Sequence, residues 1–560
     1  MGMVKAASRR RLVPATEPVP GRPEMVTNST GGYGWQITPF ERFNRFLILG
    51  SEGGSYYASE QKLTAENTAN AQAVIKADGV KAVGRIVEVS TRGLAYRVDP
   101  AIYALALAAC STDAKVQDAV RAAVPKVCRT GTHLLHFVNY ANSLRGWGRT
   151  LRRSVGAWYT EQEVDALAFQ MAKYAQRDGF SHGDVLRLVH PRTAEPARHA
   201  LFRWALGADF GKRVVSAKGR EDRAYKAVRR SSLPAIVAAF DEAKAAKTAK
   251  EIVRLIEEHR LPREAVPTEL LNDPEVWEAL LEHMPLTAMI RNLGKMTAVG
   301  LIKPLSSASK LVSDRLGNAT YLRKSRIHPL AVLVALRVYD NGHGVKGSLT
   351  WSPVPAISSA LDGAFYATFH NVVPTGKNLL VALDVSGSMG SSAAGATPLR
   401  ACEVTAAMSL VFLKTEPNVH VFGFANTFRE LGVRKGMTLG EAQAKVVQSN
   451  FGSTNIGLAV QYAIDHKLDV GGFVTMTDNE VNGGAHLSQL LQKYRRERQP
   501  EARSVIMATT STGFTVHDPQ DKFCLDVAGF DPSVPAVIAD FVRELGAGRP
   551  EVVDESSSED

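Results

Sequence analysis

Hydrophobic residues recur at helical spacing from residue 34 to about residue 370. Apolar positions at i, i+3 and i+4 form runs of about 10 to 18 residues, separated by short breaks at Pro, Gly or Asp. Clear examples begin at Val164, Ala249 and Pro274. This spacing predicts amphipathic helices, and helix pairs that return after about 40 residues indicate a degenerate helical solenoid.

The pattern changes near residue 371. Short, almost continuous apolar runs predict buried strands at 379–385, 419–424, 473–478 and 504–509. Helical patterns lie between and after them, at 401–413, 439–447, 456–466, 486–496 and 534–545. Alternating strands and helices with strands of this kind are typical of a doubly wound α/β domain.

The two ends of the chain do not support a packed core. Residues 1–33 combine a basic run at 9–11 with Pro14, Pro18, Pro20 and Pro23 and a Ser-Thr-Gly-Gly turn. The last residues are strongly acidic. We therefore expect a disordered basic arm over 1–33, a helical-repeat region over 34–370, an α/β domain over 371–545 and a disordered acidic tail over 546–560.

Composition narrows the class of protein. Hydrophobic residues make up 45% of the 560 positions and charged residues 22%, which excludes a chain that is mainly disordered or fibrous. No uncharged apolar run reaches about 18 residues, so we expect no membrane span.

The N-terminus lacks the apolar core of a signal peptide, and Ala6 breaks the myristoylation pattern. The four cysteines form no C-x-x-C pair, so they predict neither a disulfide framework nor a zinc site, and we expect a cytoplasmic protein.

Charge is unevenly distributed. Residues 1–370 hold 51 Lys and Arg against 34 Asp and Glu, whereas residues 371–560 hold 16 against 22. The excess positive charge therefore lies in the helical region and favours a polyanionic partner such as a nucleic acid. The alternative is a solvated basic surface that maintains solubility.

Oxygen-bearing side chains gather where the predicted α/β domain should bind a ligand. Asp384, Ser386 and Ser388 follow the first predicted strand, Thr454 lies in a later loop, and Asp478 ends another strand. Ligands of open α/β sheets bind at the carboxyl ends of strands, and Mg²⁺ prefers oxygen ligands. We expect a divalent cation here, Mg²⁺ or alternatively Mn²⁺. The alternative is an ordinary serine-rich turn.

This set resembles the metal-ion-dependent adhesion site of von Willebrand factor A domains. The resemblance implies that Ser386, Ser388 and Thr454 act as direct or near-direct ligands, and that Asp384 and Asp478 act directly or through water. It also implies that an open position on the ion accepts a carboxylate from a partner protein.

Basic residues are placed to present one face of a helix. Arg145, Arg149, Arg152 and Arg153 follow the spacing i, i+4, i+7, i+8. Lys173 and Arg177 are four residues apart, and His182, Arg187 and His190 follow. Such faces neutralise RNA phosphates, although each residue has a solvated surface position as its alternative. Trp147, Trp158 and Tyr159 lie among the arginines, where they either stack on bases or fill the core.

No enzyme motif stands out. The chain shows no nucleophile elbow, no H-E-x-x-H and no P-loop, and the glycine-containing segment 207–212 is too short for a P-loop. Asp384 and Asp478 leave a two-metal nuclease as an alternative, but such a site needs more carboxylates. We expect a protein without enzymatic activity.

Longer motifs at 31–36, 50–57, 144–149, 179–190, 284–297 and 326–329 are similar to those of the TROVE module of the Ro autoantigen family. The resemblance extends from about residue 30 to about residue 545 and suggests a bacterial orthologue. It implies a ring of HEAT-like helical repeats, closed by a von Willebrand factor A-like domain.

The resemblance also implies a function. Family members are ribonucleoprotein components that bind small noncoding Y RNA on an outer basic surface and single-stranded 3′ ends of misfolded RNA in a central hole. The expected role is RNA quality control or processing by a monomer, with an exoribonuclease or another protein as a further partner. Lys173, Arg177 and His190 match the family's RNA-binding surface. Arg291, Lys295 and His328 either line the hole or serve packing and capping. A metal-dependent protein-adhesion scaffold is the alternative function.

Overall fold

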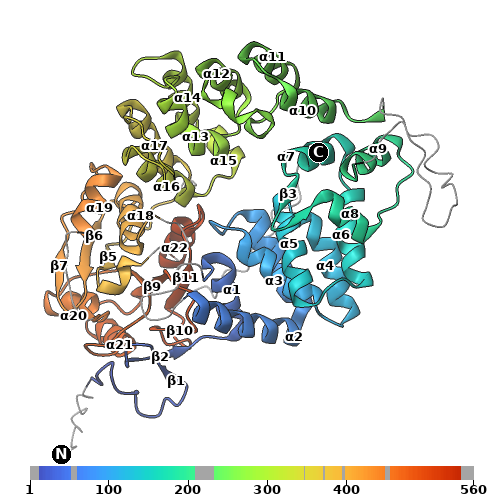
Figure 1. Cartoon of the computed structure of the whole chain (residues 1–560). Coiled ribbons are helices and arrows are strands. Elements are labelled where there is room, and N and C mark those ends of the chain that lie inside the picture. Colours follow the sequence, from blue (N-terminus) through green and yellow to red (C-terminus); the bar gives the residue numbers. More distant parts are fainter. Residues whose placement is uncertain are drawn as a thin grey trace, which may run out of the picture. The chain divides into compact units, whose positions relative to one another are not determined.

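The computed structural model describes residues 12–51, 60–207, 232–345, 347–369, 372–391, 393, 398–447 and 454–543. The chain forms two compact units, one made of residues 1–67 and 366–560 and the other of residues 68–365 (Figure 1). The described residues before Thr68 belong to the same compact unit as the α/β domain. The basic run at 9–11 and the acidic tail at 546–560 lie outside the described residues.

The unit formed by residues 68–365 is helical. Its elements are α3 (Asp99–Ala109), α4 (Ala114–Val127), α5 (Gly131–Leu144), α6 (Arg149–Thr160), α7 (Val164–Lys173), β3 (Gln176–Arg177), β4 (Phe180–Ser181), α8 (His182–Val189), α9 (Pro196–Ala205), α10 (Ala235–Ala245), α11 (Ala249–His259), η3 (Arg263–Ala265), η4 (Thr268–Asn272), α12 (Pro274–His283), α13 (Leu286–Ala298), α14 (Ser307–Gly317), α15 (Ala319–Ser325) and α16 (Pro329–Asp340). Helices α2 (Glu60–Arg92) and α17 (Pro355–Ala367) cross its boundaries.

Helix starts in this unit follow local capping chemistry. Helices α7, α11 and α12 begin at Val164, Ala249 and Pro274, which confirms the three predicted starts. The Thr248 side chain accepts a hydrogen bond from the Glu251 amide to form a capping box. Neighbouring helices then pack in pairs, such as α3 on α5, α4 on α6 and α11 on α12, and bury their apolar faces against each other.

The other unit contains a six-stranded sheet with the order β11-β9-β8-β5-β6-β7. All neighbouring strands are parallel except the edge pair β6 and β7. Its elements are α1 (Pro39–Leu49), β5 (Leu379–Asp384), η5 (Gly387–Gly390), α18 (Ala401–Thr415), β6 (Val419–Phe424), β7 (Phe428–Glu430), α19 (Leu439–Val447), α20 (Leu458–Asp465), β8 (Gly472–Thr477), α21 (Leu487–Glu497), β9 (Arg503–Ala508), β11 (Cys524–Ala528) and α22 (Val534–Arg543). The four predicted strands are β5, β6, β8 and β9.

Helices cover both faces of this sheet. Leu380, Phe424 and Ile506 pack with residues of α20 and α21 on one face. On the other face Leu379 and Val542 of α22 lie so close to Gly472 that a side chain on Gly472 would collide with both. Strands buried on both faces explain the continuous apolar runs in the sequence.

The segment from residue 12 onward is ordered, so the prediction of a disordered arm is wrong for residues 12–33. Strands β1 (Met25–Thr27) and β2 (Tyr33–Gln36) pair with β10 (Phe514–Thr515). Arg22 makes two hydrogen bonds of 2.7 and 2.8 Å with the Asp518 carboxylate, and its guanidinium lies 4.2 Å from the centre of the buried Trp35 ring. These contacts join residues far apart in sequence, so a local pattern rich in proline did not reveal them.

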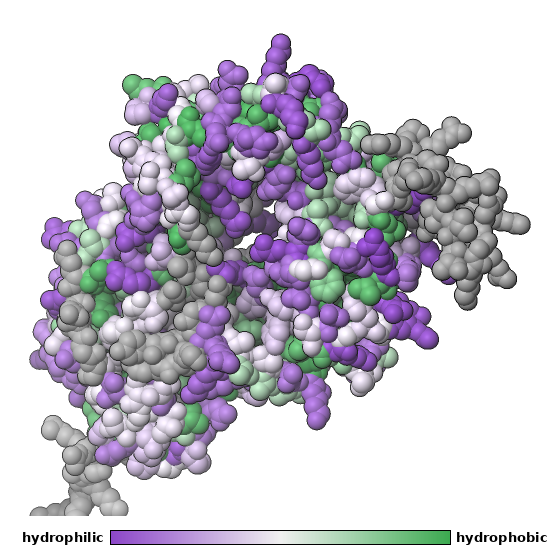
Figure 2. Space-filling view, viewed as in Figure 1, coloured by the Kyte–Doolittle hydropathy of each residue, from purple (hydrophilic) through white to green (hydrophobic). Residues whose placement is uncertain are grey.

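The face of the described chain that is seen in Figure 2 is largely polar. Figure 2 shows mostly hydrophilic and intermediate residues on the face in view, with hydrophobic residues in small groups. Among the residues that the structure describes, no helix is long and apolar enough to cross a membrane.

Candidate nucleic-acid interface and metal site

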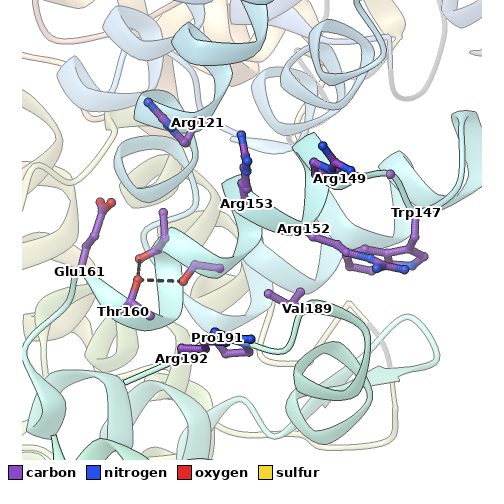
Figure 3. Close-up of a pocket in the computed structure, with 13 residues that line it drawn as sticks. Arg121, Trp147, Arg149, Arg152, Arg153, Thr160, Glu161, Val189, Pro191 and Arg192 are labelled. Atoms are coloured by element: carbon purple, nitrogen blue, oxygen red, sulfur yellow. Dashed lines mark hydrogen bonds between the residues drawn. The ribbon is translucent and has the colours of Figure 1, made fainter. Parts of the chain in front are cut away.

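A basic groove lies along helix α6 of the helical unit. Its cavity of about 760 Å³ is lined by Arg121, Trp147, Gly148, Arg149, Arg152, Arg153, Gly156, Ala157, Thr160, Glu161, Val189, Pro191 and Arg192. In Figure 3, Arg121, Arg149 and Arg153 lie on one side of the groove, and Pro191 and Arg192 on the other. We call this cavity the α6 groove. Five of its lining residues are arginines and one is acidic, so it carries a strong positive potential.

The amphipathic pattern of α6 explains why its arginines face the groove. Val155, Trp158 and Tyr159 are buried on one face of the helix, which leaves Arg149 and Arg153 exposed on the other. Within the described part of the chain, Arg149, Arg152 and Arg153 have no acidic partner. Unpaired guanidinium groups are suited to bind phosphate oxygens.

Arg145 does not share a helical face with these arginines. It caps the C-terminus of α5, and Gly146 has a φ of 76°, which ends the helix before α6 begins at Arg149. The Arg145 guanidinium donates weak hydrogen bonds to the carbonyl oxygens of Ala109 and Cys110, at 3.4 and 3.3 Å. The prediction of one continuous face is therefore wrong, and Arg145 binds the C-terminus of α3.

The three residues that the resemblance assigned to RNA binding lie on three different elements. His190 is exposed at the C-cap of α8, between the groove-lining residues Val189 and Pro191. Lys173 ends α7, where its Nζ lies 3.7 Å from the Glu264 carboxylate. Arg177 is exposed on β3. Only His190 adjoins the α6 groove, and RNA contact by all three stays a prediction.

His182 is not at the surface. It is 2% exposed, its ring stacks on Trp158, and its Nδ1 lies 2.8 Å from the Tyr159 hydroxyl. Burial lowers the pKa of His182 to about 4, so the ring stays neutral near pH 7. The prediction of RNA contact by His182 is wrong, because this residue packs in the core.

The same packing decides between the alternatives for the aromatic residues. The Trp158 indole donates a hydrogen bond of 2.6 Å to the Cys128 carbonyl, and both Trp158 and Tyr159 are buried. Trp147 is half-buried and lines the α6 groove, where it remains available for stacking.

Arg187 is exposed and its guanidinium lies 3.2 Å from the Asp184 carboxylate, so part of its charge is already compensated.

A second basic cavity of about 710 Å³ lies elsewhere in the helical unit. Its lining includes Arg97, Arg129, Arg291 and Arg326, with Asp99 as the acidic residue. His328 also lines it, but the ring accepts a hydrogen bond from the Leu330 amide and caps α16. Burial lowers the pKa of His328 to about 3, which supports the capping alternative. Arg97, Arg129 and Arg326 were not named as candidates from the sequence, whereas Arg291 was expected either to line the hole or to serve packing.

Asp384, Ser386 and Ser388 lie together at the carboxyl end of β5, and Asp478 follows the adjacent strand β8. Thr454 lies beside Asn482, whose side-chain oxygen accepts a hydrogen bond of 2.8 Å from the Thr454 amide. The Ser386 hydroxyl donates to Asp384 at 2.6 Å and lies 3.0 Å from the Ser388 hydroxyl. Asp384 also accepts a hydrogen bond of 2.7 Å from the Thr477 hydroxyl of the adjacent strand. Asp384, Ser386, Ser388, Thr454 and Asp478 are all at most 5% exposed. The parallel sheet explains this convergence, since neighbouring strands end at the same edge.

The electrostatics of this edge favour a bound cation. Burial, and then the charge of Asp478, raise the pKa of Asp384 to about 7, and burial raises that of Asp478. The Asn479 amide and one Glu480 oxygen are buried without a hydrogen-bond partner in the described structure. Among the described residues, no cluster of three or more His, Cys, Asp or Glu is suited to hold a metal. A metal held here would need the serine hydroxyls beside the two carboxylates, and such a set of hard oxygens fits Mg²⁺ or Mn²⁺.

A Ser–His–Asp arrangement in the same unit is structural. His517 Nε2 lies 2.9 Å from the Ser504 hydroxyl, and His517 Nδ1 lies 2.8 Å from Asp526. Ser504 is 0% exposed within strand β9, so no substrate reaches its hydroxyl. Arg45 of α1 forms an ion pair of 3.0 Å with Asp526, and the network holds α1 against the sheet.

Comparisons with known proteins show to which protein family the chain belongs. Residues 26–338 match the family model described as the TROVE domain, and residues 378–542 match the model described as the Ro60 vWA domain. The chain is 38% identical over 534 residues to a protein of Deinococcus radiodurans, covering 95% of this chain and 97% of that protein. The chain therefore belongs to the Ro60 family of TROVE-domain proteins.

Two further similarities agree with this assignment. A protein of Caenorhabditis elegans is 34% identical over 586 residues, covering 92% of this chain and 90% of that protein. Both relatives are named RNA-binding protein RO60. The crystal structure of the Deinococcus radiodurans RO (RSR) protein has a TM-score of 0.66 and 37% identity, covering 90% of this chain and 99% of that chain.

Proposed function

We propose that this chain is an RNA-binding protein that contacts RNA phosphates through the α6 groove. The observation that carries the proposal is the set of three exposed arginines on α6 that have no acidic partner among the described residues. Two relatives named as RNA-binding proteins, each similar over nearly the whole chain, support it.

Our proposal includes two kinds of RNA. A small structured RNA of the Y RNA type binds the outer basic surface, and a single-stranded 3′ end of a misfolded RNA binds the helical repeats. The second basic cavity, which contains four arginines, supports a second RNA-contacting region. The role is RNA quality control or processing in the cytoplasm by a monomeric ribonucleoprotein that has no enzymatic activity of its own.

A triple substitution tests the groove. Arg149→Gln, Arg152→Gln and Arg153→Gln together should weaken binding of a structured RNA by about 10- to 100-fold and reduce the slope of log K against log salt by about one unit per lost phosphate contact. The matched control removes the exposed charges of Lys244, Lys250 and Lys310, which lie on the same unit outside the groove. Equal affinities for the two triple variants, measured by filter binding from about 50 to 200 mM salt, would refute the assignment.

A second function is favoured by the geometry at the end of β5. We propose that Asp384, Ser386, Ser388, Thr454 and Asp478 hold Mg²⁺ or Mn²⁺, and that the site binds a carboxylate of a partner protein such as an exoribonuclease. The proximity of the buried side chains of Asp384, Ser386, Ser388 and Asp478 supports this proposal. Because the RNA groove and the metal site belong to different units, the two functions are separable by mutation.

A further inference from the structure

A turn formed by residues 28–32 packs against the loop 478–482, which follows strand β8. We call these two segments the N-terminal turn and the β8 loop. The Asn28 side-chain amide donates a hydrogen bond of 2.6 Å to the Val481 carbonyl, and the two residues are 8% and 2% exposed. The Asn28 side-chain oxygen accepts a hydrogen bond of 2.8 Å from the Gly32 amide, which closes the turn. One buried side chain therefore shapes the N-terminal turn and binds the β8 loop.

The N-terminal turn and the β8 loop fit together without space for a further atom. A Cβ atom on Gly32 would lie 1.7 Å from the Val481 carbonyl oxygen, far inside contact distance. Beside it, the Ser29 backbone amide donates a hydrogen bond of 2.9 Å to the Glu480 carboxylate. Only glycine allows this approach at position 32, because a side chain there would displace the turn or the loop.

Part of the β8 loop is buried without hydrogen-bond partners. The side-chain oxygen and nitrogen of Asn479 and one oxygen of Glu480 have no partner in the part of the chain that the structure describes. Asn479 also has a φ of 68°, a left-handed conformation that is unfavourable for a residue other than glycine. Both features destabilise the loop, so contacts from outside must hold its conformation. The N-terminal turn provides such contacts.

The β8 loop in turn controls two of the predicted metal ligands. Asp478 is its first residue, and the Asp478 carboxylate accepts a hydrogen bond of 3.1 Å from the Glu480 amide. Thr454 lies against its last residue, Asn482. The Thr454 amide donates a hydrogen bond of 2.8 Å to the Asn482 side-chain oxygen, and the Asn482 amide donates one of 3.1 Å to the Thr454 carbonyl. A displacement of the β8 loop would therefore move Asp478 and Thr454 together.

We infer that the N-terminal turn is a positioning element of the proposed metal site, because it holds the loop that places Asp478 and Thr454 for Mg²⁺ or Mn²⁺. Asn28 and Gly32 act through the β8 loop and are positioning residues, not ligands. Residues that orient metal ligands typically change metal affinity by about 10- to 100-fold when they are lost. The inference rests on the proposed metal site and goes beyond it by assigning N-terminal residues that set its affinity.

The coupling between the turn and the metal is reciprocal. If the N-terminal turn raises the affinity for the metal, the bound metal must stabilise the turn by the same factor. Metal binding at one edge of the sheet should therefore protect a segment that lies hundreds of positions earlier in the chain.

Metal titration of the full-length chain tests the inference, with Mn²⁺ alone as the probe. Asn28→Ala and Gly32→Ala should each raise the Kd for Mn²⁺, measured by calorimetry, about 10- to 100-fold. Asn378→Ala is the matched control and should leave this Kd unchanged. It also removes a hydrogen bond from a side-chain amide to a carbonyl, at 2.9 Å to Asp469, but at the opposite end of β5.

Hydrogen exchange of the unmodified chain tests the coupling even if a turn variant fails to fold. Saturating Mn²⁺ should slow exchange of the Ser29 and Gly32 amides by about tenfold or more, and Asp384→Ala should abolish this protection. A turn that only supports the fold would exchange at the same rate with and without Mn²⁺.

Equal Kd values for Asn28→Ala, Gly32→Ala and Asn378→Ala overturn the inference, and so does turn exchange that Mn²⁺ leaves unchanged. If Asp384→Ala loses Mn²⁺ while both turn variants bind it normally, only the inference fails. If the unmodified protein binds no Mn²⁺, the proposed metal site fails and the inference fails with it.

Discussion

The Tyr159 hydroxyl lies 2.8 Å from Nδ1 of His182 and joins α6 to α8 in the core of the helical unit. The opposite nitrogen of the ring has no partner in the described structure, and burial lowers the pKa of His182 to about 4. The residue that first resembled an RNA contact therefore supports the helices on which the α6 groove is built.

This relationship predicts a loss of stability in weak acid. In the unfolded chain His182 titrates near its ordinary pKa of 6.5, whereas in the folded chain it stays neutral until about pH 4. Between these values the unfolded state binds more protons, so the free energy of unfolding falls as the pH falls from 6.5 toward 4. The loss at pH 5 is about 2 kcal/mol from this residue. His133 and His328, with pKa values lowered mainly by burial to about 4 and about 3, act in the same direction.

Urea unfolding at pH 7.5 and pH 5.0 measures this effect. His182→Gln should lose less stability between the two pH values than the unmodified protein does, whatever its stability at pH 7.5. His190→Gln is the control, because His190 is exposed. A pH dependence that is identical for His182→Gln and the unmodified protein would contradict the prediction.

The proposed metal site predicts stabilisation by Mg²⁺ or Mn²⁺. A cation that binds only the folded state raises the free energy of unfolding by about 2.7 kcal/mol at 100 times its Kd. Asp384→Ala and Ser388→Ala should abolish this gain while leaving RNA affinity unchanged, since the basic groove belongs to the other unit. Calorimetric titration with each metal and thermal unfolding provide the measurements. Asp314→Ala on the exposed face of α14 is the control, and a gain retained by Asp384→Ala would refute the site.

Glycine substitutions test the packing of Trp351. Gly294→Ala places a methyl group 2.6 Å from the Trp351 ring, so we expect a destabilisation of about 1 to 3 kcal/mol. Gly84→Ala changes an exposed glycine inside α2 that has open space around it, and should stabilise by about 0.5 to 1 kcal/mol. Denaturant unfolding compares the two. If the two substitutions change the free energy of unfolding by the same amount, the close packing of Trp351 against Gly294 is refuted.

The N-terminal segment predicts an effect on the α/β unit. Arg22→Ala removes the two hydrogen bonds to Asp518 and the stacking over Trp35, and leaves a carboxylate that is 8% exposed without this partner. We expect a loss of about 1 to 3 kcal/mol and faster proteolysis within residues 12–37. Glu24→Gln changes a more exposed partner of the same arginine and should have a smaller effect. Unchanged proteolysis of the Arg22→Ala variant would mean that other contacts hold this segment.

Sequence reasoning succeeded where neighbouring residues carry the information. The starts of α7, α11 and α12 were predicted because capping and helical periodicity act within a few residues. Asp384 and Asp478 were brought together correctly because parallel strands must end at one edge of a sheet.

It failed where a helix break was overlooked and where residues distant in sequence meet. Arg145 was placed on the face of α6 because its spacing is helical, although Gly146 interrupts the helix. Arg121 and Arg192 were missed because they reach the α6 groove from α4 and from the segment after α8.

The sequence by itself determined the class of the two main units, the ends of many helices and the set of oxygen donors, because periodicity, capping and strand order are local or topological properties. Only the tertiary structure decided that His182 is a neutral core residue, that residues 12–33 pack on the α/β unit, and that residues 28–32 hold the loop after β8. Burial and cavity shape depend on contacts between residues hundreds of positions apart, and no local pattern encodes them.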